Sequence, residues 1–199
     1  MSNLNPQVEE KLRQAFKQLN RFMLLLWRLG LGAWINAWPE VGGRILVITH
    51  TGRVTGFRRR TPVNFAIVGG EIYCAAGFGS ISDWYRNILA NPQVEVWLPD
   101  GWWQAVVEDV SDHPLRLHLM RQVLIGSGFA ARIFGLNPHT LSDPDLAAVS
   151  ENYRLLHIRR CAPRTGPDGP GDLAWVWPLS TFILLPLALR RRRRRRLFI

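Results

Sequence analysis

The sequence predicts a small α+β domain that is mainly β and folds as a barrel or a sandwich. Short runs of β-branched and aromatic residues, separated by glycine-rich turns, follow one another through residues 44–160. Segments with a helical pattern interrupt these runs instead of alternating with them, which argues against a doubly wound parallel sheet. The length of 199 residues, with 47% hydrophobic and 20% charged residues, fits one domain with its own core and excludes a disordered chain.

Residues 1–43 are predicted to form an amphipathic helix, over residues 7 to about 34, and a linker. The helix combines several leucines and a tryptophan with Lys17, Arg21 and Arg28, and spacings of four and seven place these cations on one face. A basic helix of this kind can lie in a membrane interface. Its apolar face can equally cap an open end of a barrel, and the sequence leaves both alternatives open.

The barrel domain is predicted to span residues 44–160 and to be built mainly from hairpins. Gly69-Gly70 marks one tight turn, and Pro99-Asp100-Gly101 marks another. Ser80, with the acid Asp83 three residues later, is typical of a capping box that opens a helix. The strands are expected at residues 44–50, 60–68, 71–76, 93–98, 102–110 and 153–158, and the helices from the capping box to about residue 90, at 114–124 and shortly before the last strand.

The C-terminal region is predicted to lie outside the barrel. Residues 161–172 form a proline- and glycine-rich linker, and residues 173–199 combine an uncharged segment with seven consecutive arginines, Arg190 to Arg196. The uncharged segment is just short of a membrane span and contains two prolines, so we expect shallow contact with a membrane surface. The seven arginines account for 7 of the formal net charge of +10. Because the +3 that remains is ordinary, no nucleic-acid partner is expected.

Two glycine-containing segments on neighbouring predicted strands could hold an anion. The first, residues 51–62 (TGRVTGFRRRTP), is a turn in which backbone amides can approach an anion closely, and its four arginines suit phosphate or carboxylate. Strand alternation sends Arg58 and Arg60 to one face and Arg59 to the other, so these three cannot all serve one ligand. The second, residues 75–80 (AAGFGS), leads into a helix N-terminus, which also favours phosphate.

These segments belong to a longer pattern that resembles the deazaflavin-dependent nitroreductase family. In chain order the pattern consists of TGR at residue 51, TG at 55, Arg59, TP at 61, AA at 75, DWYRN at 83 and ANPQVEV at 90. Its most specific parts are the TGR turn and W-Y-x-N-x-x-A-N-P-x-V, and the resemblance covers about residues 21–159. It implies a split β-barrel of the FMN-binding type with an N-terminal helix and peripheral helices. It also implies a bacterial oxidoreductase that binds the deazaflavin coenzyme F420 and passes a hydride to a quinone, a nitro compound or another activated acceptor.

The resemblance also assigns residues to the coenzyme. Arg53, Arg59, Pro62, Ala75 and Trp84 match coenzyme-contacting positions of the family. Together with the two anion-binding segments, they give an expected coenzyme site of Thr51, Gly52, Arg53, Arg58, Arg59, Arg60, Thr61, Pro62, Ala75, Ala76, Gly77, Phe78, Gly79 and Trp84. Coenzyme F420 is the expected cofactor, and FMN is the alternative.

The chain departs from the family pattern at three places. It has Val54 where relatives have lysine, and Gly77 and Phe78 where several relatives have serine and lysine. It has Phe129 and Phe134 in the stretch where the best-studied branch has tyrosines that line the substrate pocket. These departures motivate an alternative function, a non-catalytic binding module of the same fold that holds F420, a flavin, haem or an apolar ligand.

His50, next to the TGR turn, and His139, in a later loop, are the weak candidates for donating a proton near neutral pH. No histidines have the spacing of metal ligands, so no metal site is expected. Cys74 and Cys161 imply no disulfide framework, and no signal peptide is expected. The sequence therefore predicts a cytoplasmic protein attached to the inner face of the cell membrane, and it leaves the acceptor and the oligomeric state open.

Overall fold

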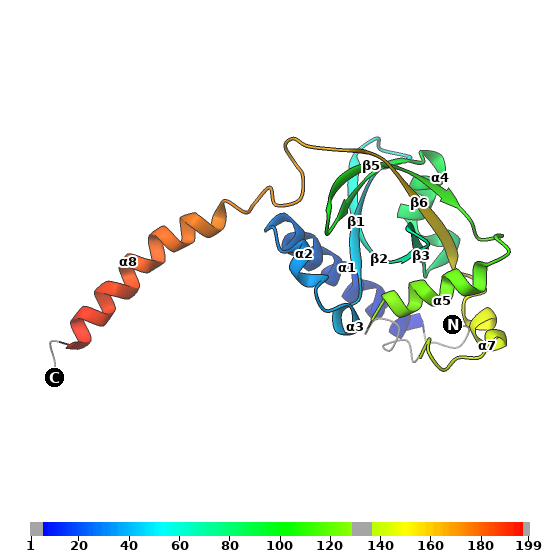
Figure 1. Ribbon diagram of the computed structural model, residues 1–199, viewed down its shortest axis with the longest axis horizontal. Coiled ribbons are helices and arrows are strands. Elements are labelled where there is room, and N and C mark those ends of the chain that lie inside the picture. Colours follow the sequence, from blue (N-terminus) through cyan, green and yellow to red (C-terminus); the bar gives the residue numbers. More distant parts are fainter. Residues whose placement is uncertain (1–5, 129–136, 197–199) are drawn as a thin grey trace.

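Six antiparallel strands close into a barrel in which the neighbours follow the order β1-β2-β3-β6-β5-β4 (Figure 1). The structure is a computed structural model that describes residues 6–128 and 137–196. It confirms the predicted α+β class and the predicted split-barrel architecture with peripheral helices. The strands are β1 (Ile45–Thr51), β2 (Arg58–Val68), β3 (Glu71–Ala76), β4 (Gln93–Leu98), β5 (Gly101–Asp109) and β6 (Arg154–Pro163).

The interior of the barrel is filled by the alternate residues of each strand, because successive side chains point to opposite faces. One end is closed by α4 (Asp83–Ala90), whose Tyr85 and Ile88 are buried in the same core. The Tyr85 hydroxyl donates to the Asp109 carboxylate, which ties α4 to β5. The strands contribute Leu46, Ile48, Val63, Phe65, Ile72, Cys74, Ala76, Val94, Val96, Leu98, Ala105, Val107, Leu156 and Ile158 to this core.

A second core lies between the outer wall of the barrel and two helices, α5 (Arg116–Gly126) and α7 (Asp143–Val149). Leu119, Met120 and Val123 of α5 pack against outward-facing residues such as Ala66 and Leu155. Ser142 caps α7 by accepting a hydrogen bond from the Asp145 amide. These helices cover the wall made by β2, β3 and β6, whereas α1 lies against β2 and, through Trp27, against β1, β4 and β5.

The predicted N-terminal helix is shorter than expected and lies along the wall of the barrel. Helix α1 (Pro6–Arg28) ends before Gly30, whose φ of +80° is left-handed, and two single-turn helices follow, α2 (Gly32–Ile35) and α3 (Pro39–Gly42). The prediction of one helix to residue 34 is therefore wrong. Trp27 of α1 is buried against Trp97, with ring centroids 6.4 Å apart. Because α4 closes the end of the barrel, α1 covers the outer wall instead.

The predicted linker after the barrel is largely packed onto it. Strand β6 continues to Pro163, so the first three residues assigned to the linker belong to the sheet. The amide of Gly171 donates to the Trp27 carbonyl at 3.0 Å, and Arg60 donates to the Asp168 carbonyl at 2.7 Å. Residues 164–175, which we call the strap, therefore bind the end of α1 to the barrel.

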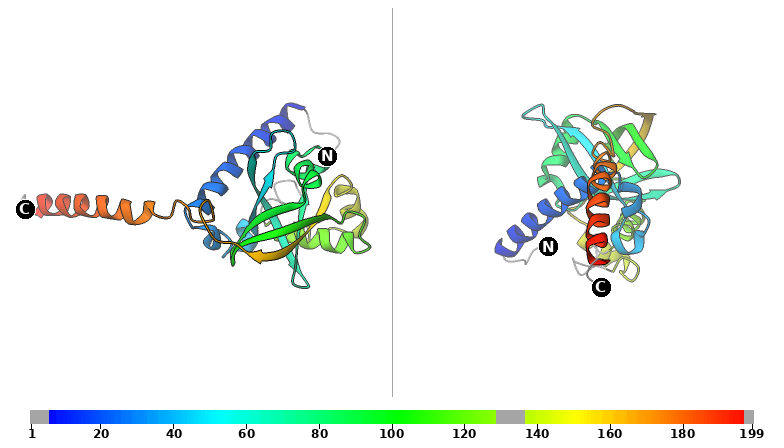
Figure 2. Two further views of the ribbon diagram at one scale, coloured as in Figure 1. Left: turned by 90° about the horizontal axis from the view of Figure 1, so that it is seen from above. Right: turned by 90° about the vertical axis from the view of Figure 1, so that its left-hand side faces the viewer.

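The last helix, α8 (Val176–Arg196), extends away from the barrel in Figure 1 and in the left view of Figure 2. Within the described ranges, no helix is both long enough and apolar enough to cross a membrane.

Candidate functional site

The turn between β1 and β2 is a tight loop that needs two of its glycines. The Gly52 amide donates to the Phe57 carbonyl at 2.9 Å, and the Gly56 amide donates to the Gly52 carbonyl at 2.8 Å. A side chain at Gly52 would place its Cβ 2.9 Å from Thr55 Oγ1 and 3.1 Å from Arg59 Nε. Gly56 has a φ of +68°, which favours glycine. The turn is thus a compact loop of exposed backbone beside arginine side chains.

Arg53 docks this turn onto α4. Its backbone amide and its guanidinium both donate to Asn87 Oδ1, at 3.0 and 3.1 Å, and the guanidinium also pairs with Asp83 at 3.0 Å. Asn87 is only 3% exposed, so the docking point is inside the protein, whereas Asp83 lies on the surface. The turn and α4 therefore form one unit at this end of the barrel.

His50 hydrogen-bonds to Asn87, the residue onto which Arg53 docks. The Asn87 amide donates from Nδ2 to His50 Nδ1 at 3.3 Å, which leaves the proton on Nε2 to be donated to Thr61 Oγ1 at 3.1 Å. Burial, with a smaller contribution from the charge of Arg59, lowers the pKa of His50 from 6.5 to about 4. His50 is thus neutral near pH 7, with both ring nitrogens in use, and this favours a positioning role over proton donation.

The four arginines of the segment fall into two groups, as strand alternation predicts. Arg58 pairs with Glu95 on the outer wall, and the Arg60 guanidinium stacks 4.8 Å from the centroid of Trp97 on the same wall. Arg59, paired in register with His50, is on the other face. Among the described residues, no hydrogen bond or ion pair satisfies the Arg59 guanidinium.

The second predicted segment, between β3 and α4, is shaped by packing. Ala76 is buried in the barrel core, and Ala75 packs towards α5. Gly79 has a φ of +58°, and a Cβ there would lie 2.1 Å from the Asn152 carbonyl oxygen. Trp84, on α4, packs against the barrel core and is half-buried.

The helix start differs from the predicted capping box. A short 3-10 helix, Gly79–Ile81, precedes α4, and Ser82 occupies the N-cap position without a side-chain hydrogen bond. The predicted Ser80–Asp83 box is therefore wrong. Asp83 instead pairs with Arg53, because the turn approaches α4 from the side.

A cleft of about 490 Å³ opens on the outer wall beside the same turn. The Glu95 carboxylate lies in it and pairs with Arg58 and, at 2.8 Å, with Arg164. The Thr49 hydroxyl is buried and has no hydrogen-bond partner in the described structure. The lining residues are Thr49, His50, Thr51, Arg58, Asn91, Gln93, Val94, Glu95, Gln104, Ala105, Val106, Cys161 and Arg164.

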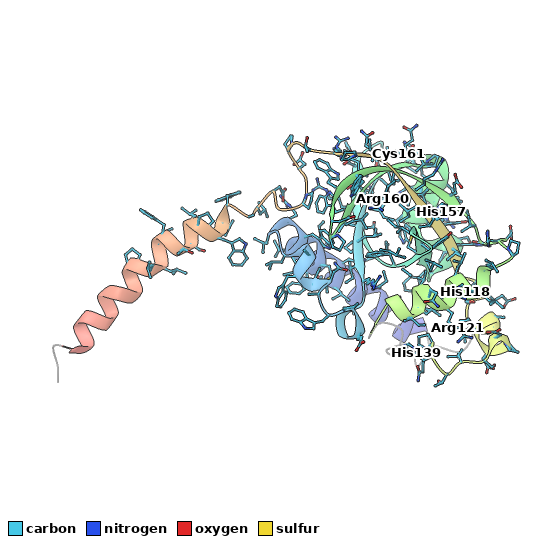
Figure 3. The ribbon with its side chains drawn as sticks, in the orientation of Figure 1. His118, Arg121, His139, His157, Arg160 and Cys161 are labelled. Carbon is cyan, nitrogen blue, oxygen red and sulfur yellow. The ribbon has the colours of Figure 1, made fainter. Side chains whose placement is uncertain are left out.

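Apart from His139, the predicted residues are thus distributed over three places. Arg53, Arg59, His50 and Thr61 meet at the turn, with Gly52 inside it. Arg58, Arg60 and Pro62 face the outer wall, and Gly77 and Phe78 lie in the connection to α4. His139 lies beside Arg121 near α7, across the barrel from α4 (Figure 3). Phe129 and Phe134 lie outside the described residues, and within those residues no cluster could hold a metal ion.

Three residues of this region were not predicted, namely Asn87, Asp83 as the partner of Arg53, and Glu95. Asn87 and Asp83 stand in the DWYRN motif, so the motif itself carried a signal. Their role depends on contacts over 30 and 34 positions of sequence, which periodicity does not reveal.

The model of one protein family, described as F420H(2)-dependent quinone reductase, matches residues 31–133. Several solved structures are also similar. A conserved hypothetical protein from Mycobacterium tuberculosis is 18% identical over 70% of this chain and 90% of its own, with a TM-score of 0.44. HutZ, a haem storage protein from Vibrio cholerae, is 16% identical over 67% of this chain and 87% of its own, with a TM-score of 0.41. An F420-H2 dependent reductase, FDR-A, is 19% identical over 58% of this chain and 92% of its own, with a TM-score of 0.39.

Proposed function

The chain belongs to the F420H(2)-dependent quinone reductase family, and from this premise we propose that it is an oxidoreductase that uses reduced coenzyme F420 to reduce a quinone. A nitro compound or another activated acceptor is the alternative substrate. Quinones with long tails reside in lipid, so contact with the inner face of the cell membrane is part of the proposal.

The observation that carries the proposal is the Arg59 guanidinium beside a glycine-bounded turn. A cation without a hydrogen-bond or ion-pair partner in the described structure suits an anionic group. Arg53 lies at the same turn and forms an ion pair with the exposed Asp83. An anion could replace Asp83 at a small cost in free energy, because exposed ion pairs are weak. Coenzyme F420 carries a phosphate and an acidic tail, which matches these cations.

The other residues of the turn would position the coenzyme. Asn87 and His50 fix Arg53 from inside the protein, and the half-buried Trp84 would supply apolar surface on the side of α4. When bound, the coenzyme itself supplies the hydride. The chain would contribute binding, orientation and exclusion of water, and the neutral His50 would keep its proton on Nε2.

The alternative is a binding module without turnover, holding F420, FMN, haem or an apolar ligand. Two features favour it: Val54 and Phe78 stand where relatives have lysine, and the Arg53 charge is already neutralised in part by Asp83. A module of this kind would bind the ligand and would not oxidise the reduced coenzyme in the presence of a quinone.

Fluorescence titration with F420, and separately with FMN, tests the coenzyme assignment. We expect saturable binding of F420 that Arg59→Ala weakens by about 10- to 100-fold, the value of one or two charge-assisted hydrogen bonds. Arg159→Ala is the matched control, because Arg159 pairs with Glu108 on the exposed outer wall. Preference for FMN, binding of neither, or equal loss in both variants would contradict the assignment.

A further inference from the structure

The uncharged part of α8 is an apolar helix whose large side chains are mostly exposed in the described structure. From Val176 to Leu189 its only polar side chains are Ser180 and Thr181. The exposed fraction of Phe182 reaches 80%. A helix that is apolar on all sides is normally buried. Large hydrophobic residues are exposed along it at Trp177, Leu179, Phe182, Ile183, Leu184 and Leu185, and Trp175 is exposed just before it.

The base of α8 is fixed to the N-terminal helices by the strap. Arg28 forms a two-pronged ion pair with Asp172, at 3.0 and 2.8 Å. The Leu173 amide donates to the Arg28 carbonyl at 2.8 Å, and Trp177 Nε1 donates to the Leu29 carbonyl at 2.9 Å. α8 therefore leaves the protein at a defined point, beside α2.

Two further aromatic residues are exposed on α2 and just after it. Trp34 and Trp38 are both more than half exposed, and their ring centroids are 5.0 Å apart. In Figures 1 and 2, α2 lies next to the base of α8. We call Trp34, Trp38 and the exposed hydrophobic residues of α8 the terminal surface; it is formed by two parts of the chain that are far apart in sequence.

The positive charge next to the terminal surface favours an anionic lipid bilayer as its partner over a second copy of this chain. The apolar part of α8 runs directly into the seven arginines 190–196, and Lys17 and Arg21 are exposed on α1. Arginine pairs well with phosphate, and tryptophan favours the headgroup level of a bilayer. A second copy of this chain would add seven more positive charges, whereas an anionic lipid surface neutralises them.

The length of α8 sets the depth of contact. Its uncharged part, Val176 to Leu189, is roughly 21 Å long at 1.5 Å per residue, shorter than a hydrocarbon core of about 30 Å. The tryptophans at its base and the arginines at its end both favour the headgroup level. A helix held at that level by both ends lies along one leaflet.

We propose that the terminal surface docks onto an anionic lipid bilayer, with α8 lying along the boundary between headgroups and acyl chains. The barrel then sits at the membrane surface, at a fixed orientation set by the strap. This inference concerns lipid binding alone and does not depend on the identity of the coenzyme. It deepens the proposed function, because a quinone dissolved in the same leaflet would be within reach.

Co-sedimentation of the full chain with vesicles tests the inference. We expect binding to mixed phosphatidylglycerol–phosphatidylcholine vesicles, weakened by salt, and much weaker binding to phosphatidylcholine alone. Glutamine in place of all seven arginines should lower binding to the anionic vesicles by about 100-fold or more. The double variant Phe182→Asp, Leu185→Asp should lower it by about 10-fold or more, because charges replace two exposed apolar side chains that would enter the lipid.

Leu115→Asp is the matched control, because Leu115 is 58% exposed and lies before α5, away from α8. It should leave lipid binding unchanged. All variants change exposed positions or the end of α8, so their thermal unfolding midpoints should equal that of the original chain. Equal binding of the original chain to neutral and anionic vesicles would overturn the inference.

The double variant Trp34→Ser, Trp38→Ser tests whether the two tryptophans bind lipid together with α8 or whether α8 binds alone. We expect about a 10-fold loss of binding to anionic vesicles, and an unchanged affinity would overturn the joint surface. Sedimentation without lipid tests the competing possibility that a second copy of the chain binds the terminal surface. A dimer that dissociates in the Phe182→Asp, Leu185→Asp variant would show this and would overturn the inference. The coenzyme titration is done without lipid, so failure of lipid binding is distinguishable from failure of the proposed function.

Discussion

Arg59 and His50 are neighbours across two strands, and their charges are linked. His50 is 3% exposed and its ring nitrogens bond Asn87 and Thr61. The positive charge of Arg59 opposes a second positive charge on the ring. An anion bound to Arg59 would weaken this repulsion and raise the pKa of His50. Binding of an anion at the turn and protonation of His50 are therefore coupled.

The low pKa of His50 predicts a loss of stability in mild acid. The folded state, with a pKa of about 4 at His50, binds fewer protons than the unfolded state between pH 4 and 6.5. Stability from this group is therefore complete above about pH 6.5 and falls as the pH drops towards 4, by up to about 3 kcal/mol. Urea unfolding at pH 7 and pH 4.5 measures it. His50→Gln should reduce the loss on acidification, and an unchanged loss would show that other groups cause it.

At the residue scale, strand alternation was enough to predict that Arg58 and Arg60 lie on one face of β2 and Arg59 on the other. The partners of these arginines were not predictable. Glu95 is 37 positions from Arg58, and Asp168 is 108 positions from Arg60. Such pairs depend on how the barrel closes, which the local pattern does not contain.

At the scale of elements, the connection between β3 and α4 combines a sharp bend with close packing. The sequence alone suggested that the helix N-terminus at this connection favours a phosphate. The structure adds a packing reason for Gly79, because the Asn152 carbonyl leaves no room for a Cβ. The capping box failed for a related reason, because a 3-10 turn fills the space before α4.

Alanine substitutions at two glycines with left-handed φ distinguish the cost of backbone strain from the cost of a steric clash. Gly70→Ala, at a φ of +86° where an added Cβ meets no described atom within 4 Å beyond its chain neighbours, should lower the free energy of unfolding by about 1 to 2 kcal/mol. Gly79→Ala adds a clash at 2.1 Å with the Asn152 carbonyl oxygen and should lower it by about 3 kcal/mol or more. Urea unfolding of both variants measures the difference. Equal losses would mean that the β3–α4 connection moves aside freely.

The elements were predicted with very different success along the chain. β3 and β4 have the expected bounds, because a glycine pair and a Pro-Asp-Gly turn mark their hairpins. The N-terminal helix was predicted too long, since a helical pattern continues past Gly30, where the backbone turns left-handed. β6 was predicted too short, because its last residues resemble a linker in composition and are held by pairing with β5.

At the scale of the whole molecule, the sequence predicted a barrel but not its closure. β6 lies between β3 and β5, far from both in sequence. The strap likewise depends on the ion pair of Arg28 with Asp172, which are 144 positions apart. The overall charge was interpreted correctly as a property of the C-terminal end, and that end leaves the barrel as α8 (Figure 2).

Steady-state oxidation of reduced F420 by a soluble quinone is the most direct test of the proposed activity. The rate is followed by the return of the absorbance of the oxidised coenzyme. We predict turnover that saturates in both substrates, with kcat/KM lowered about 10- to 100-fold by Arg59→Ala and unchanged by Arg159→Ala. Oxidation no faster than in the absence of the protein, with F420 still bound, would contradict the account and identify the chain as a binding module.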